Sequence, residues 1–206
     1  MIRKEDISVT NDVLNTHSAM RVTSVERPRS LFARLLYRVS SIAFGKVLTP
    51  VSVIYARKPK LAVIAGLITR MQDKGLTIEP SLRFLIQAQV SRLNGCAFCH
   101  DLALAQAMRQ HIGVDRFHNL AAYRDNLAFS NRERAALSLV DEATIHRRVS
   151  DETWATVHTY FDDTEIIELV WLNAAENYFN LQATVLGIGS DDLSERLLRH
   201  AAVTQL

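Results

Sequence analysis

Residues 94–101 read Asn94-Gly95-Cys96-Ala97-Phe98-Cys99-His100-Asp101 and contain both cysteines of the chain. The two cysteines stand three positions apart, directly after an Asn-Gly turn signal and at the start of an apolar-periodic run. This placement predicts a dithiol at the N-terminus of a helix, where free backbone N–H groups and the helix dipole favour a thiolate. Two sulfurs so spaced can also close into a small disulfide ring.

Three uses of the cysteine pair are open, and redox chemistry is favoured. Two buried cysteines could serve only as small apolar residues. A structural zinc site needs four ligands, and no second CxxC or HxxxH follows at zinc-finger spacing, so we predict no metal site. Because the only two cysteines form a CxxC at a helix start, a redox-active pair is the better interpretation.

His100 is a third candidate catalytic residue. It could stabilise a thiolate when protonated or accept the thiol proton when neutral. Neighbouring helical residues point about 100° apart, so a direct contact between Cys99 and His100 is not assured. The competing interpretation is a surface histidine.

Composition limits the classes of function. The chain has 206 residues, 24 basic and 22 acidic side chains and a net charge of +2, without the basic stripe of a nucleic-acid-binding protein. Neither GxGxxG nor a P-loop is present, so we predict no nucleotide cofactor. The polar opening residues are unlike a signal peptide, and no apolar run reaches the roughly 20 residues of a membrane span. We therefore expect a cytoplasmic protein without stable membrane association.

Helical periodicity runs through the chain and no strand pattern does, so we predict an all-α fold. With only 7 Gly and 4 Pro, a turn-rich β architecture is disfavoured. We expect a polar arm over residues 1–29 and one helical domain over 30–206. One helix is expected to begin at Ser30, with its apolar face towards the core. Further helices are expected over 60–73 and 80–93, from the cysteines to about 111, over 114–123, from 131, from 151, and over 163–186.

The cysteine segment and two later stretches resemble the carboxymuconolactone decarboxylase family, specifically its alkylhydroperoxidase D-like branch. The likeness rests on the helix followed by Asn94–Cys99, on Phe129–Leu137, and on Asp163–Leu186, where Asn173, Asn177 and Asn180 stand in the last core helix of the family. It covers roughly residues 45–190.

The resemblance implies an all-helical protein that assembles as dimers, trimers or hexamers. It implies a thiol that reduces a hydroperoxide, a dithiol that becomes a disulfide, and an external thiol reductant that resets the pair. The second cysteine of the family motif attacks the peroxide, which would make Cys99 peroxidatic and Cys96 resolving. The dipole argument alone favours Cys96 as the activated thiol, and we follow the family order.

The sequence departs from the family at the proton relay. Members with the full relay have a Glu twelve residues before the first cysteine and a His four after the second, and these positions are Phe84 and Ala103. Loss of general-base help slows thiol attack by about 10²–10⁴. His100 or Asp101 could substitute, as could Glu176 or Tyr178 on the last helix if the fold brings one of them close; Gln87 and Gln89 are amides and neither acids nor bases.

We therefore predict a CxxC-dependent thiol oxidoreductase acting on hydroperoxides. Two alternatives stand beside it. One is a carboxymuconolactone decarboxylase-like enzyme on another small molecule, which would not need the cysteines. The other is a non-catalytic helical oligomer whose CxxC senses redox state.

Overall fold

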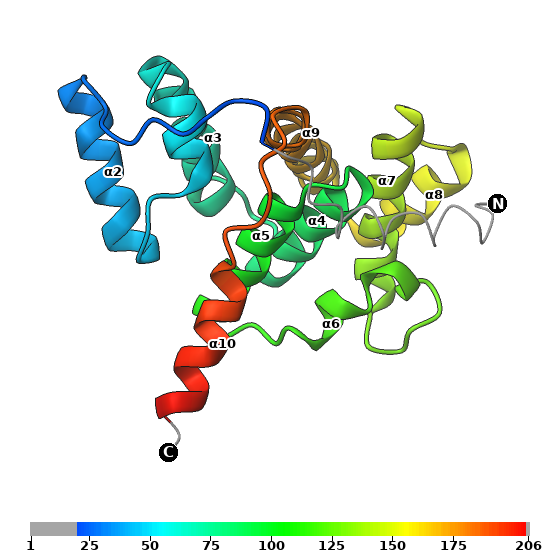
Figure 1. Ribbon diagram of the computed structural model, residues 1–206. Helices are drawn as coiled ribbons and strands as arrows, with labels where there is room; N and C mark the ends of the chain where they lie inside the picture. Colours follow the sequence, from blue (N-terminus) through cyan, green and yellow to red (C-terminus); the bar gives the residue numbers. More distant parts are fainter. Residues whose placement is uncertain (1–19, 205–206) are drawn as a thin grey trace.

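The computed structural model describes residues 20–204, which form helices joined by short loops, with no strand in this range. The centre of the molecule consists of α4 (Pro80–Leu93), α5 (Ala97–Arg109), α7 (Asn131–His146) and α9 (Asp163–Val185) (Figure 1). The predicted all-α class is confirmed. No helix in residues 20–204 is long and apolar enough to cross a bilayer.

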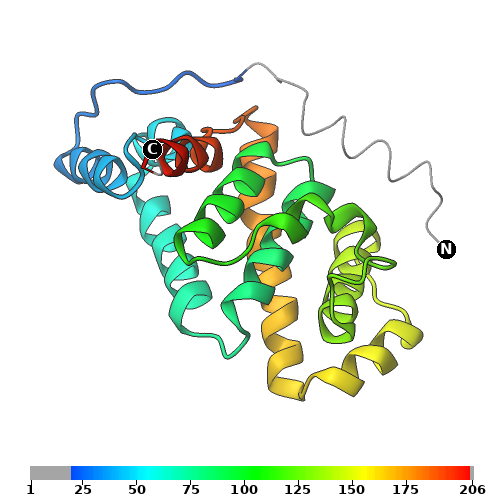
Figure 2. The same ribbon diagram turned by 90° about the horizontal axis from the view of Figure 1, so that it is seen from below.

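The remaining elements surround this centre (Figure 2). They are α2 (Leu31–Phe44), the π-helix η1 (Val51–Tyr55), α3 (Pro59–Lys74), α6 (Asp115–His118), the 3-10 turn η2 (Leu120–Ala122), α8 (Asp151–Tyr160) and α10 (Leu193–Thr204). The predicted helix over 114–123 is therefore two short pieces, α6 and η2.

Local sequence explains the main helix starts. Proline occupies the first turn of α3 and of α4, where its missing N–H costs nothing. Ser130 begins α7 with a capping box. Its side chain accepts from the Glu133 N–H, and the Glu133 carboxylate accepts from the Ser130 N–H. Asp162 begins α9 in the same way.

Helix α4 is the axis of the core. Every residue from 82 to 92 is buried, because α5, α7 and α9 all pack on it. One apolar cluster joins α4 to α7, α8 and α9, a second joins α4 to α5 and the α6 region, and a third lies around the two cysteines. The cysteine helix is thus held between the second and third clusters.

The expectation that the apolar face of α2 points to the core is wrong for this chain by itself. Leu31 and Ile42 are 78% and 80% exposed, and Leu35 and Val39 are also exposed. Only the opposite side, which includes Ala33 and Ser40, is buried.

Helix α10 has no counterpart in the sequence prediction. Asp101 of α5 holds its first turn: the carboxylate accepts from the Leu193 and Ser194 N–H groups and from the Ser190 and Ser194 hydroxyls at 2.6–2.9 Å. Burial would raise the pKa of Asp101, but these hydrogen bonds outweigh it and the pKa is lowered. Asp101 is therefore engaged in holding α10.

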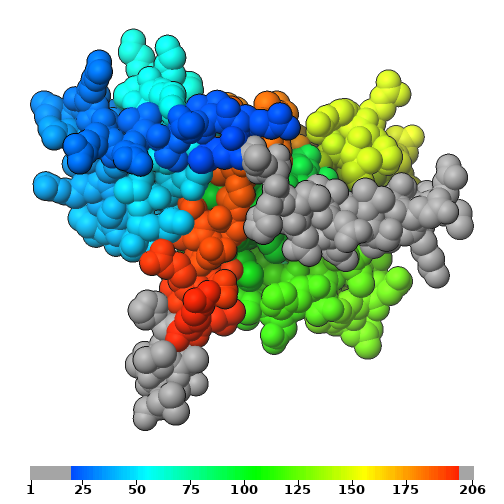
Figure 3. All heavy atoms as spheres, in the orientation of Figure 1, coloured from blue at the N-terminus to red at the C-terminus, as the bar shows by residue number. Residues whose placement is uncertain are grey.

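The predicted arm falls partly outside the described residues, which exclude 1–19. Residues 20–29 contain no helix and run over the surface between the end of α9 and α2 (Figure 3). The Arg21 N–H donates to Leu186 O at 2.9 Å and the Val25 N–H to Ser52 O at 3.0 Å.

Candidate active site

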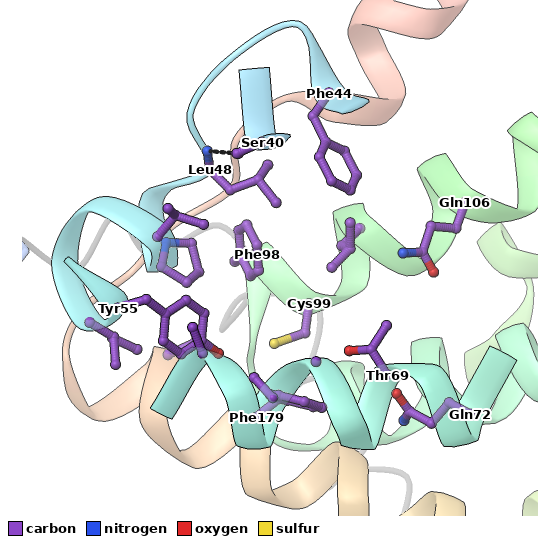
Figure 4. Close-up of a pocket in the computed structure, with 18 of the residues that line it drawn as sticks. Ser40, Phe44, Leu48, Tyr55, Thr69, Gln72, Phe98, Cys99, Gln106 and Phe179 are labelled. Carbon is purple, nitrogen blue, oxygen red and sulfur yellow. Dashed lines mark hydrogen bonds between the residues drawn. The ribbon is translucent and has the colours of Figure 1, made fainter. Parts of the chain in front are cut away.

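A cavity of about 650 Å³ lies between the N-terminal helices α2, η1 and α3 and the core helices α4, α5 and α9. Its volume falls in the range of small-molecule sites, roughly 300–1,000 Å³. The lining is mostly apolar. In Figure 4, Phe44, Leu48, Tyr55, Phe98 and Phe179 lie around Cys99, and Thr69 and Gln72 of α3 lie to the other side of it.

Cys99 is the only cysteine among the residues that line this cavity. It is joined by a disulfide to Cys96, with the two Cα atoms 5.4 Å apart. Cys96 is the N-cap of α5 and its Sγ accepts from the Cys99 N–H at 3.3 Å, so the predicted placement at a helix N-terminus is confirmed. Cys96 is fully buried and does not line the cavity. A small molecule in the cavity therefore meets Cys99 first.

Glu176 of α9 lines the same cavity. Its Oε1 lies 2.8 Å from the Asn180 Nδ2 and 3.1 Å from the Ser91 Oγ. Burial raises the pKa of Glu176 to about 7, against the lowering effect of these two hydrogen bonds. A carboxyl that is half ionised near neutral pH can accept a proton from a thiol and return it.

Phe84 and Ala103, which replace the relay residues of the resembled family, lie together. Both belong to the apolar cluster between α4 and α5, and Phe84 is fully buried. A carboxylate at position 84 would here enter this apolar cluster, on the side where the Arg83 guanidinium lies 4.6 Å from the centre of the Phe84 ring. The carboxyl of Glu176 enters the site from α9 instead.

The other candidate residues for proton transfer lie elsewhere. His100 lines a separate, smaller hollow with Asp101, Ser190 and Ser194, as its position next to Cys99 on the helix allows. Burial lowers the pKa of His100 and so favours the neutral imidazole, although Asp101 partly opposes this effect. Tyr178 does not line the cavity, whereas Tyr55 does. The pKa of Tyr55 is raised to about 12, mainly by burial and further by the neighbouring Tyr178.

Sequence reasoning missed the polar residues contributed by α3 and dismissed one from α4. Gln72 and Gln87 both line the cavity and are buried. Gln89, two positions further, points away and bonds Asp141. No sequence signal separates Gln87 from Gln89, because nearly all of α4 is buried and its sides face different clusters. In residues 20–204, no group of three or more His, Cys, Asp and Glu could hold a metal ion.

Comparison with known proteins gives a family and a fold. The model of the carboxymuconolactone decarboxylase family matches residues 67–142, which include both cysteines. The uncharacterized protein YdfG of Bacillus subtilis (strain 168) is 31% identical over 116 residues, which are 55% of this chain and 79% of YdfG.

Solved structures share the fold at low identity. An uncharacterized peroxidase-related protein from Ralstonia eutropha JMP134, an alkylhydroperoxidase AhpD core, has a TM-score of 0.72 and 16% identity, covering 87% of this chain and 96% of that one. The debrominase Bmp8 in complex with 2,3,4-tribromopyrrole has a TM-score of 0.73 and 18% identity, with the same coverage of both chains.

Proposed function

The chain belongs to the carboxymuconolactone decarboxylase family, and on that basis we propose that it is a dithiol oxidoreductase that reduces a hydroperoxide. One observation carries the proposal: Cys99 of the CxxC pair and the buried carboxyl of Glu176 line the same small-molecule cavity. The thiolate is the reacting form of cysteine, so a base in the cavity supplies what the sequence lacks at Phe84 and Ala103.

In the first step, the Glu176 carboxylate accepts the proton of the Cys99 thiol. The thiolate attacks the outer oxygen of the hydroperoxide, the O–O bond breaks, and the alkoxide takes a proton to leave as an alcohol. Cys99 is then a sulfenic acid. The Glu176 carboxyl, with a pKa of about 7, can return the proton to the leaving oxygen.

In the second step, the Cys96 thiol attacks the Cys99 sulfenic acid, and water leaves as the disulfide forms. Cys96 is buried, bonded to Cys99 and absent from the cavity lining, which suits a resolving cysteine that must reach its partner but not the substrate. An external thiol reductant resets the pair. The sum is one hydroperoxide and two thiols converted to one alcohol, one water and one disulfide.

Thiol counting tests the proposal. The reduced protein is treated with one equivalent of cumene hydroperoxide, and free thiols are titrated under denaturing conditions. We expect both thiols to disappear in the wild type. Cys96→Ser should keep a trappable sulfenic acid at Cys99, and Cys99→Ser should not react. If both thiols persist, or if Cys99→Ser reduces the peroxide at the wild-type rate, the proposal fails.

The catalytic role predicted for His100 from the sequence needs its own test, because His100 adjoins Cys99 in the chain but lines a different hollow. Our mechanism assigns the proton transfer to Glu176. We therefore expect His100→Gln to leave the rate of thiol oxidation within about threefold of the wild type. A loss as large as that of Glu176→Gln would move the relay to His100.

A second candidate is reduction of a carbon–halogen bond by the same dithiol. The aromatic lining around Cys99 favours it, and the debrominase Bmp8 shares the fold. Two thiols would supply two electrons, giving the ring C–H, halide and the disulfide. Incubating the reduced protein with a bromopyrrole and measuring bromide release separates this chemistry from peroxide reduction. Turnover of any substrate that survives a double Cys→Ser change would instead support decarboxylase-like chemistry.

We also propose that the protein is a homo-oligomer. The exposed apolar face of α2, with Leu31, Leu35, Val39 and Ile42, would be covered by another subunit. Light scattering on the full chain tests this. Leu35→Glu should dissociate the assembly, and a monomeric wild type would contradict it.

A further inference from the structure

Two amide groups in the cavity each have one atom without a hydrogen-bond partner in the described part of the chain. The Nε2 of Gln72 and the Oε1 of Gln87 are buried and bond no described residue. Both side chains line the cavity, and they are only 4% and 8% exposed. A buried amide atom without a partner costs about 1–3 kcal/mol, so such atoms in a cavity indicate that a bound molecule completes them.

Both amides are held on rigid elements. The main-chain oxygen of Gln72 accepts from Arg83 Nη1, and the same guanidinium forms an ion pair with Asp73 at 3.2 Å, which fixes the end of α3 against α4. The main-chain oxygen of Gln87 accepts from the Ser91 hydroxyl at 2.7 Å. The cavity thus has one unpartnered donor on α3 and one unpartnered acceptor on α4, each carried by a held stretch of backbone.

The Gln72 amide lies on another side of the cavity than the reacting sulfur. In Figure 4 the sulfur of Cys99 points away from Gln72, towards the side of Tyr55 and Phe179. A molecule whose reactive group sits at the sulfur therefore meets Gln72 with a different part. The remaining walls between these two ends are mainly hydrocarbon and aromatic rings.

The lining also carries charges of both signs. Glu176, which Ser91 links to the turn of α4 that carries Gln87, is acidic, whereas Arg70 and Lys74 of α3 are basic. Asp73 also lines the cavity, while the guanidinium of Arg83 is already paired with it.

We propose that Gln72 and Gln87 form a specificity site for a substrate with an apolar body and a second polar group that both accepts and donates a hydrogen bond, such as a carboxamide or hydroxyl. Gln72 would donate to this group and Gln87 would accept from it. This deepens the proposed function by naming a substrate class for the same cavity. The specificity site rests on the proposed function only in so far as the bound molecule is called a substrate.

Ligand binding to the oxidised full-length protein tests the proposal without turnover. Three probes of the same shape are titrated at pH 8: benzamide, which donates and accepts; acetophenone, which only accepts; and benzoate, which is anionic. We expect benzamide to bind about tenfold more tightly than either acetophenone or benzoate, because neither of these can donate to Gln87 and a lost hydrogen bond to a buried group costs about a factor of ten.

Two variants assign the contacts. Gln87→Leu should weaken benzamide about tenfold and leave acetophenone unchanged, whereas Gln72→Leu should weaken both. Gln110→Leu, the same change at an exposed position outside the cavity, is the control. Equal affinity for the three probes, no binding of benzamide, or variants that bind like the control would overturn the proposal. The probe series on the wild type decides even where a variant does not fold.

These outcomes are separable from those of the proposed function. A protein whose thiols ignore hydroperoxides but which binds benzamide through the two glutamines has the specificity site without the peroxidase activity. A protein with active thiols and no preference among the probes has the activity without the site.

Discussion

Glu176→Gln should raise stability at alkaline pH while it lowers activity. The carboxyl is buried and its pKa is raised from 4.5 to about 7. A folded-state pKa above the unfolded value means that the folded chain binds this proton more tightly. The stabilisation is fully present below about pH 4.5 and is lost as the pH rises through about 7.

The size of the effect follows from the shift. Each pKa unit is worth about 1.4 kcal/mol, so ionising Glu176 in the fold costs about 3 kcal/mol by pH 8.5. Glutamine has nearly the same shape, does not ionise, and can still accept from Asn180. Its two hydrogen-bonding neighbours, Asn180 and Ser91, do not titrate in this range. Other groups titrate in both proteins and cancel in the difference.

Thermal unfolding of the oxidised proteins measures this difference. At pH 4.5 the two should unfold within about 2 °C of each other. At pH 8.5 the variant should unfold about 6–12 °C higher, since 1 kcal/mol shifts the midpoint of a chain of this size by about 2–4 °C. Glu152→Gln, an exposed glutamate in α8, is the control for the loss of one charge. A wild type that is the more stable protein at pH 8.5, or a difference independent of pH, would refute the assignment of a buried carboxyl with a raised pKa.

Three further changes test neighbouring parts of the account. Ser91→Ala removes a hydrogen bond that lowers the pKa of Glu176, so the pH midpoint of Cys99 oxidation should move upwards, and an unchanged midpoint would deny the contact. Phe84→Glu puts a carboxylate into the apolar cluster that contains Ala103. It should lower the free energy of unfolding, measured by chemical denaturation, by about 3–5 kcal/mol and should not accelerate Cys99 oxidation; a variant as stable as the wild type and faster would contradict this. Asp101→Ala removes the carboxylate that holds α10, so the amides of that helix should lose hydrogen-exchange protection while the dithiol still cycles, and retained protection would show that the helix is held otherwise.

The helices could be predicted wherever local signals coincide. The Ser130 and Asp162 caps and Pro59 and Pro80 mark starts that the structure has at the same places. Helix α10 could not be predicted in this way, because its first turn is held by Asp101, 92 positions before Leu193 in the chain. The prediction that the apolar face of α2 is buried in the core was wrong for the single chain. Periodicity shows that a helix face is apolar, but it does not show what covers that face.

The site was predictable in part. The cysteine pair and its position at a helix start follow from residues 94–101 alone, and the order of the cysteines follows from the family resemblance. Glu176 could be named only as one of several residues that could replace the relay. Its use as a base for Cys99 depends on α9 and α5 lining the same cavity, which the sequence does not show. Gln72 and Gln87 carry no local signal at all, since amides occur on every surface and only the missing partners distinguish these two.

The pH dependence of Cys99 oxidation, measured in single turnover with cumene hydroperoxide, tests the central claim most directly. In the wild type the rate should rise with pH through a midpoint near 7, as Glu176 becomes the base. In Glu176→Gln the rate should be about 10²-fold or more lower and should lack that midpoint. Equal rates and the same pH profile in the two proteins would contradict the claim that Glu176 activates Cys99.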